Sequence, residues 1–265
     1  DEPQHVKQGR TTLELLDCIG IAHELLPTDA DQARELVVRA TEYMRQKQSP
    51  FAIVVADGTF EKYGAVPESS DFEMRREDAV RGIAAKIGKS AVIVATTGKT
   101  ARELFEYRAE TGGDHARDFL TVGSMGHASQ IAMSIAKTRN ARQVICLDGD
   151  GALIMHMGSL AIIGTSGTQN FKHIVINNGA HDSVGGQPTA GHEINICEIA
   201  RACCYRSAER IEKTGELDAA IDRLLNSEGP ALLEIVTRTG ARSDLGRPTI
   251  SPIENKQSFM RNIEE

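Results

Sequence analysis

The chain has 265 residues, of which 40% are hydrophobic, so it can bury a core, and a mainly disordered protein is excluded. Acids and bases are interspersed and give a formal charge of -7, which argues against a nucleic-acid partner. No apolar segment approaches the roughly 20 residues that span a bilayer, and the five cysteines form no CxxC pair, so we expect a cytoplasmic protein with reduced cysteines and no membrane partner.

Short β-rich segments alternate with stretches of helical periodicity along the chain. The predicted strands are 51–56, 91–96, 118–122, 143–147, 173–177 and 231–236. The predicted helices are 31–46, 74–87, 100–109, 127–137, 154–163 and 215–226. This alternation, with strands that are apolar almost throughout, predicts an α/β fold with a doubly wound, mainly parallel sheet.

A segment rich in Gly, Pro, Ser and charge, 63–78, separates the first predicted strand from the others, and we expect a linker and a domain boundary there. The predicted parts are 1–66, which closes a first α/β domain, the main domain 72–240, and a C-terminal extension 241–265. The vicinal pair Cys203-Cys204 is expected on the buried face of a helix.

Polar, glycine-containing loops follow four of the strands, where an open parallel sheet binds its ligands. They are TTGKT at 96–100, GSMGHAS at 123–129, DGDGA at 148–152 and NNGAHDSVGGQPT at 177–189. The first loop is not a Walker A motif, because Ile93 stands where that motif needs glycine. It is either a plain polar turn or a phosphate loop that uses backbone N–H groups and the Thr100 hydroxyl.

Asp150 and Asn178 form the most informative pair. Mg²⁺ prefers oxygen ligands and takes only one or two from protein side chains when phosphates supply others. Gly149 and Gly151 would let a phosphate approach the backbone. The 25 residues between Gly151 and Asn177 are enough for one helix and one strand, so the two loops can meet at one edge of the sheet.

The sequence Gly149-Asp150-Gly151 followed by Asn177-Asn178 resembles the diphosphate-and-metal motif of thiamine diphosphate-dependent decarboxylases. This resemblance implies that Asp150, the Asn178 side chain and the backbone carbonyl of Ala180 hold Mg²⁺, with Asp148 as a supporting turn residue. The cofactor-binding residues that it implies are Thr97, Gly98, Lys99, Gly123, Ser124, Met125, Gly149, Asp150, Gly151, Ala152, Asn178 and Ala180.

The same resemblance gives roles to Met125 and His181. Met125 matches the apolar residue that bends the cofactor into a V shape, and the Gly123 backbone matches the acceptor for its 4′-amino group. Without the resemblance, Met125 would be a core residue after a helix-entry turn. His181 is a candidate for substrate binding or proton transfer, against the alternative of a surface histidine, with Ser183 and Gln187 as further donors.

Within the family, the sequence most resembles the phosphonopyruvate decarboxylases, with the sulfopyruvate decarboxylases as near relatives. The segments that carry this resemblance are 1–5, 123–129, 149–161 and 177–189. Residues 72–240 resemble the whole diphosphate-binding domain, whereas 1–63 resemble only the closing part of a pyrimidine-binding domain. The glutamate that activates the cofactor in this family has no match. We therefore expect a C-terminal portion that needs an N-terminal portion for activity.

The function implied by the resemblance is decarboxylation of 3-phosphonopyruvate to phosphonoacetaldehyde and CO₂ with thiamine diphosphate and Mg²⁺. The partners would be a small anionic 2-oxoacid, contacted by Lys99 and His181, and further copies of the chain in a homo-oligomer. Sulfopyruvate or another 2-oxoacid is the alternative substrate. Two other hypotheses are a cofactor-binding module that acts beside a separate pyrimidine-domain chain, and a nucleotide-binding phosphotransferase that uses TTGKT.

Overall fold

The structure is a computed structural model that describes residues 3–61 and 71–264. The chain divides into two compact units, Asp1–Val66 and Pro67–Glu265. Much of the expected linker, from 63 to 70, lies outside the described residues, and so do residues 1 and 2 of the stretch 1–5 that carried part of the resemblance. Across the described residues, every helix is too short or too polar to cross a membrane.

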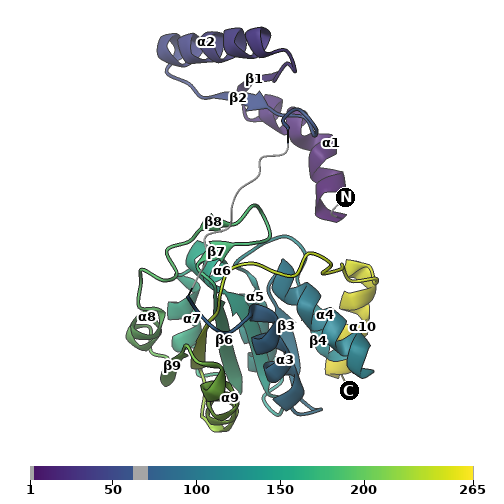
Figure 1. The fold of residues 1–265 in the computed structure, drawn as a ribbon, viewed down its shortest axis with the longest axis vertical. Coiled ribbons are helices and arrows are strands. Elements are labelled where there is room, and N and C mark those ends of the chain that lie inside the picture. The colour runs from purple at the N-terminus through teal and green to yellow at the C-terminus, as the bar shows by residue number, and fades with distance from the viewer. Residues whose placement is uncertain (1–2, 62–70, 265) are drawn as a thin grey trace. The chain divides into compact units, whose positions relative to one another are not determined.

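The first unit contains two helices and two short parallel strands (Figure 1). They are α1 Pro3–Cys18, β1 Ala22–Leu25, α2 Ala30–Lys47 and β2 Phe51–Val54. Helix α2 begins where Asp29 accepts a hydrogen bond from the Gln32 N–H, and it buries Leu36 and Ala40. The predicted helix 31–46 and strand 51–56 correspond to α2 and β2.

The second unit is built on a six-stranded sheet with the order β4-β3-β5-β6-β10-β9. The strands are β3 Val92–Ala95, β4 Asp118–Leu120, β5 Val144–Gly149, β6 Phe171–Asn177, β9 Ser207–Ile211 and β10 Ala231–Val236. Every neighbouring pair is parallel. The predicted α/β fold with a doubly wound parallel sheet is therefore confirmed.

Helices cover both faces of this sheet (Figure 1). They are α3 Arg76–Lys86, α4 Lys99–Thr111, α5 Ala128–Thr138, α6 Asp150–Met155, α7 Ser159–Gly164, α8 Ile196–Ala202, α9 Leu217–Asn226 and α10 Pro252–Glu264, with short 3₁₀ turns at His115–Arg117 and Thr214–Glu216. Helices α3, α4 and α9 pack with strand residues such as Ile93 and Ala95. Helices α5, α7, α8 and α10 pack with alternate residues such as Val92 and Val94. Because alternate side chains enter opposite layers, the strands are apolar almost throughout.

Several details of the predicted elements are wrong, and α1, β1, α8 and α10 were not predicted. The predicted helix 154–163 is two short helices, α6 and α7, and strand β9 was missed because its sequence, SAERI, is half polar. Asp148 is no turn residue: it lies within β5 and is 1% exposed. Cys203 follows α8 as its cap and Cys204 is exposed with φ 70°, so this pair is not on a buried helix face.

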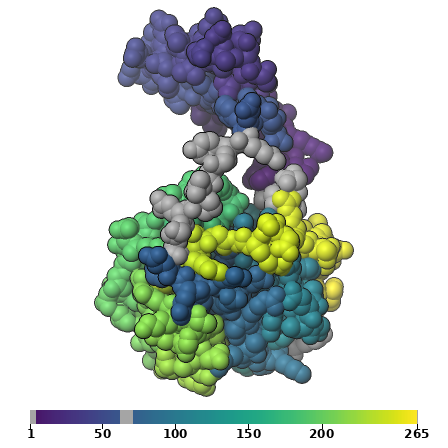
Figure 2. Space-filling model, in the orientation of Figure 1, coloured from purple at the N-terminus to yellow at the C-terminus, as the bar shows by residue number. Residues whose placement is uncertain are grey.

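The C-terminal segment belongs to the second unit and completes its edge. In α10 the buried Asn255 amide donates to the Asp118 carbonyl at 2.9 Å and accepts from the Leu120 N–H at 3.0 Å, so it continues the hydrogen bonding of edge strand β4. The segment after β10 runs over the surface beside the start of α3 (Figure 2), where Arg242 pairs with Glu77 at 3.2 Å. This brings residues about 165 positions apart in sequence together.

The sheet places four of the polar loops side by side. Strands β4, β3, β5 and β6 are consecutive in the sheet and parallel, so the loops that follow them leave from the same edge. These are the four loops with glycine and polar residues described above. A short antiparallel hairpin, β7 Ala180–His181 with β8 Gln187–Pro188, follows β6 at this edge.

Candidate functional site

A pocket opens where the loops after β3, β5 and β6 converge, and the loop before α5 reaches it with Met125. Its lining includes Arg76, Thr96, Thr97, Lys99, Thr100, Met125, Gly149, Asp150, Gly151, Ala152, Ile176, Asn178, Ala180, His181, Asp182 and Ser183. The structure thus brings together most of the residues singled out from the sequence. Gly98, Gly123, Ser124 and Gln187 do not line the pocket.

Asp150 is a buried carboxylate at the first position of α6. Its Oδ2 accepts a hydrogen bond from the Thr189 hydroxyl, which in turn accepts from the Gly191 N–H at 3.0 Å. Burial raises the pKa of Asp150, and the Thr189 hydroxyl and nearby backbone N–H groups oppose the rise. A bound cation would also favour the ionised form, because it neutralises the charge that burial makes costly.

The two asparagines after β6 have different surroundings. The Asn177 amide is fully buried and donates to Glu234 Oε1 and to the Gly191 carbonyl, both at 2.8 Å. Asn177 therefore holds the loop together. Asn178 lines the pocket; its Nδ2 donates to Asp182 at 2.7 Å, and its Oδ1 lies 3.4 Å from the Ala180 N–H. The side-chain oxygen of Asn178 is thus the one placed for a ligand.

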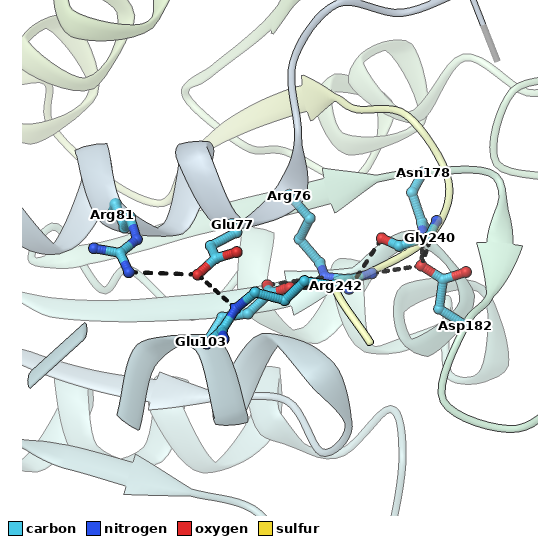
Figure 3. Close-up of polar contacts among 8 residues, drawn as sticks. All are labelled: Arg76, Glu77, Arg81, Glu103, Asn178, Asp182, Gly240 and Arg242. Carbon is cyan, nitrogen blue, oxygen red and sulfur yellow. Dashed lines mark hydrogen bonds and ion pairs between the residues drawn. The ribbon is translucent and has the colours of Figure 1, made fainter. Parts of the chain in front are cut away.

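Arg76 is the residue that the sequence prediction missed most clearly (Figure 3). It is 5% exposed, and its guanidinium forms a two-pronged pair with Glu103, with Nε–Oε2 at 2.9 Å and Nη2–Oε1 at 3.0 Å. A third nitrogen donates to Asp182 at 2.6 Å. Burial raises the pKa of Glu103 and Arg76 opposes the rise. The network joins α3 and α4 to the loop after β6.

The loop after β3 contributes a polar wall. The Thr96 hydroxyl oxygen is buried and, among the residues that the structure describes, has no hydrogen-bond partner, although Thr96 lines the pocket. Gly98 has φ 110°, which non-glycine residues rarely adopt, and lies next to Ser183. Helix α4 begins at Lys99, so Lys99 and Thr100 stand at its first turn. An unpartnered hydroxyl at this place is suited to a ligand oxygen.

The loop after β4 turns sharply before α5. Gly123 and Ser124 have φ values of 69° and 46°, and the half-buried Met125 that follows them lines the pocket. Met125 is not part of either buried core cluster of the described residues. Its place fits a residue that shapes a ligand better than a core residue.

His181 lies directly over the backbone of Gly151. A Cβ built on Gly151 would stand 2.6 Å from Cε1 of His181, so any larger residue would displace the ring or the loop. The glycine therefore lets the β6 loop close onto the start of α6. His181 lines the pocket beside Asp182 and Ser183.

Several residues of the site could not be identified from sequence. Arg76 lies in a stretch that the sequence suggested was linker, and Glu103 lies among ordinary helix residues. Asp182 and Thr189 belong to a loop already singled out. Nothing in the loop sequence indicates that Asp182 contacts Asn178 or that Thr189 contacts Asp150. A charged residue at the start of a helix, such as Arg76, is normally expected to be exposed, and its burial is recognised only when the fold shows its oppositely charged partners.

The donor set fits a hard divalent cation and a phosphate-bearing ligand. Asp150 and Asn178 offer a carboxylate and an amide oxygen, and Ala180 offers a backbone carbonyl in the same pocket. Above the Gly149 backbone the nearest atom to a Cβ would be the Ile176 carbonyl oxygen at 3.9 Å, whereas the corresponding space at Gly151 is taken by His181. Together with the unpartnered Thr96 hydroxyl, these features fit the metal and the diphosphate expected from the sequence.

Residues 96–235 match the family model described as "Thiamine pyrophosphate enzyme, C-terminal TPP binding domain". This range runs from the loop after β3 to the end of β10 and includes the four loops at the carboxyl edge. The match covers more than half of the chain.

Relatives of known name extend the similarity beyond this domain. The phosphonopyruvate decarboxylases of Streptomyces viridochromogenes and Streptomyces hygroscopicus are 32% and 30% identical over 98% of this chain. The chain spans 68% and 67% of those two proteins, about two thirds. The sulfopyruvate decarboxylase subunit beta of Methanocaldococcus jannaschii is 30% identical over 71% of this chain and 97% of its own length.

Among solved structures, one described as "a putative thiamin diphosphate-dependent enzyme isolated from Mycobacterium smegmatis" superposes with a TM-score of 0.53. The superposition covers 71% of this chain and 37% of that one, with 20% identity. This likeness supports the fold.

Proposed function

The chain belongs to the thiamine pyrophosphate enzymes, and on this premise we propose that it takes part in the Mg²⁺-dependent decarboxylation of a 2-oxoacid, 3-phosphonopyruvate, to phosphonoacetaldehyde and CO₂. The observation that carries the proposal is the convergence of Asp150, Asn178 and Ala180 in one pocket with the loop that presents Met125. The names of the two Streptomyces relatives support the choice of substrate. A cytoplasmic location is part of the same proposal.

The residues of the pocket divide into an anchoring group and an orienting group. Asp150, the Asn178 amide oxygen and the Ala180 carbonyl would hold Mg²⁺, while the backbone at Gly149 and Gly151 would admit the diphosphate. Three further residues of the proposed cofactor site line the same pocket, namely Thr97, Lys99 and Ala152, and Gly98 lies in the loop between Thr97 and Lys99. Bound thiamine diphosphate would supply a nucleophilic carbon and accept the electrons that CO₂ leaves behind.

The orienting group acts on the reactive end of the ligand. Met125 would set the bend of the cofactor, with Gly123 and Ser124 forming the turn that presents it. Lys99 and His181 are the cationic or proton-bearing groups that we propose for the acidic end of the substrate. Holding reactants in one geometry removes much of the entropic barrier.

The proposal assigns the second unit, over 72–240, to the diphosphate-binding domain and the first unit to the closing part of a pyrimidine-binding domain. The Methanocaldococcus subunit beta, matched over 97% of its length, supports a diphosphate-binding region that works with a second polypeptide or segment. We therefore propose that activity requires a homo-oligomer and a further pyrimidine-domain portion, since the chain spans about two thirds of the Streptomyces relatives. Residues 241–265 remain a C-terminal extension of the second unit.

A decarboxylation assay tests the function and separates the two substrates. The chain, alone and together with an N-terminal portion taken from a Streptomyces relative, is incubated with thiamine diphosphate and Mg²⁺. We expect phosphonoacetaldehyde from 3-phosphonopyruvate in the combined preparation, with at least about tenfold lower kcat/KM for 3-sulfopyruvate. A preference for 3-sulfopyruvate would mean that sulfopyruvate, and not phosphonopyruvate, is the substrate. If no 2-oxoacid yields an aldehyde, the proposed reaction is refuted.

A further inference from the structure

We propose that Asp182, held in place by Arg76, is a positioning residue that turns the Asn178 amide so that its oxygen, and not its nitrogen, faces the metal. The inference rests on the proposed function, because it concerns the metal site of that proposal. It adds two residues, from α3 and from the loop after β6, that neither the sequence motif nor the family match assigns to metal binding.

One carboxylate oxygen of Asp182 collects three donors (Figure 3). Oδ2 accepts from Asn178 Nδ2 at 2.7 Å, from Arg76 Nη1 at 2.6 Å and from the Gly240 N–H at 3.0 Å. The donors come from the β6 loop itself, from α3 and from the segment after β10. The Asp182 side chain is 11% exposed, so water competes weakly for these contacts.

This arrangement selects one of the two faces of the Asn178 amide. A primary amide presents an acceptor on one side and two donors on the other, and only the oxygen can bind a cation. With Nδ2 donating to Asp182, a turn of the amide by half a rotation would bring its oxygen against the carboxylate. Two acceptor oxygens would then face each other with no hydrogen between them, so the contact with Asp182 sets the metal-binding orientation before the ion arrives.

Arg76 fixes Asp182 and also prevents it from becoming a ligand itself. The Arg76 guanidinium is locked by Glu103 through two parallel hydrogen bonds and donates to the Gly240 carbonyl at 3.3 Å. The Arg76 guanidinium is therefore fixed and cannot shift together with the Asp182 carboxylate. Because Asp182 Oδ2 already accepts from Arg76, Asn178 and the Gly240 N–H, the cation is left to Asp150, Asn178 and the Ala180 carbonyl.

Two substitutions at one position separate geometry from charge. Asp182→Asn keeps an acceptor oxygen in place but removes the charge, whereas Asp182→Glu keeps the charge but moves the acceptor by one methylene. Mn²⁺ binding to the full chain, measured by electron paramagnetic resonance with and without thiamine diphosphate, is the readout. Asp244→Ala removes an exposed carboxylate of the same unit, 78% exposed, and is the matched control.

Removing a partner of a metal ligand commonly weakens metal binding by about 10- to 100-fold, and we expect a loss of that size for Asp182→Glu. Asp182→Asn should stay within about threefold of the wild type, and the Asp244→Ala control within about twofold. Wild-type affinity of Asp182→Glu would overturn the inference, because the position of the acceptor would then not affect metal binding. Asp182→Asn binding as weakly as Asp182→Glu, or more weakly, would also overturn it, because the charge of residue 182 would then be what matters.

The proposed function fails in a different way. If Mn²⁺ binds neither the wild type nor any variant, or if Asp150→Ala binds it as tightly as the wild type, the metal site itself is wrong, and the inference falls with it. If Asp150→Ala loses Mn²⁺ while Asp182→Glu retains it, the metal site stands and only the positioning role of Asp182 is refuted.

Discussion

Asp150→Ala is expected to abolish the joint binding of thiamine diphosphate and Mg²⁺. The substitution removes the one anionic oxygen ligand in the proposed set, and the diphosphate would lose the cation that compensates its charge. We expect affinity to fall by at least about 100-fold, more than for the loss of an outer partner. Calorimetric titration with cofactor and metal together, and with each alone, measures the effect and its coupling.

Asp218→Ala is a suitable control for this experiment, since it removes an exposed aspartate at the start of α9 in the same unit. It should leave binding unchanged. Undiminished binding by Asp150→Ala would remove the metal assignment. Loss of metal binding with retained cofactor binding would mean that the diphosphate is held by the backbone and the Thr96 loop alone.

Arg76→Met is expected to destabilise the second unit by about 3–5 kcal/mol. Methionine retains much of the aliphatic stem, but Glu103 and Asp182 would stay in place without their cation, at 2% and 11% exposure. An uncompensated buried carboxylate is far costlier than a lost surface pair. Urea unfolding followed by circular dichroism measures the change, with the transition of each unit fitted separately.

The double variant Arg76→Met/Glu103→Gln should recover part of this loss, because it removes one of the stranded charges. Arg206→Met provides the matched control: Arg206 pairs with Glu228 at 2.8 Å, but both side chains are about half exposed. We expect the control to cost no more than about 1 kcal/mol. If Arg76→Met and Arg206→Met lower the free energy of unfolding equally, burial of the Arg76 network adds nothing to the cost of losing its cation.

The fold was predictable because the strands of the second unit are covered on both faces. Continuous apolar stretches such as 91–96 and 143–147 identify such strands without any knowledge of their partners. Strand β9 lies at the sheet edge and mixes buried, half-buried and exposed residues without a regular alternation, so its pattern is weak. The boundary between α6 and α7 was missed for a related reason, since apolar periodicity continues across the break.

The loops of the site were predictable, but the contacts that organise them were not. Asp150 and Asn178 are recognisable from residue type and spacing, which are local properties of the chain. Arg76 and Asp182 are separated by 106 positions and meet only through the packing of α3 against the sheet. Asp148 shows the opposite error: it stands beside the motif but lies buried in β5, 3.4 Å from His173, with its Oδ1 accepting from the Gly149 N–H.

The most direct test of the account is the position of the metal in crystals grown with thiamine diphosphate and Mn²⁺ in place of Mg²⁺. The anomalous signal of manganese locates the ion without reference to the protein atoms. We expect one peak bound by the Asp150 carboxylate, the Asn178 amide oxygen and the Ala180 carbonyl, with the diphosphate completing the coordination. A peak elsewhere, or cofactor in the pocket with no metal at these three residues, would contradict it.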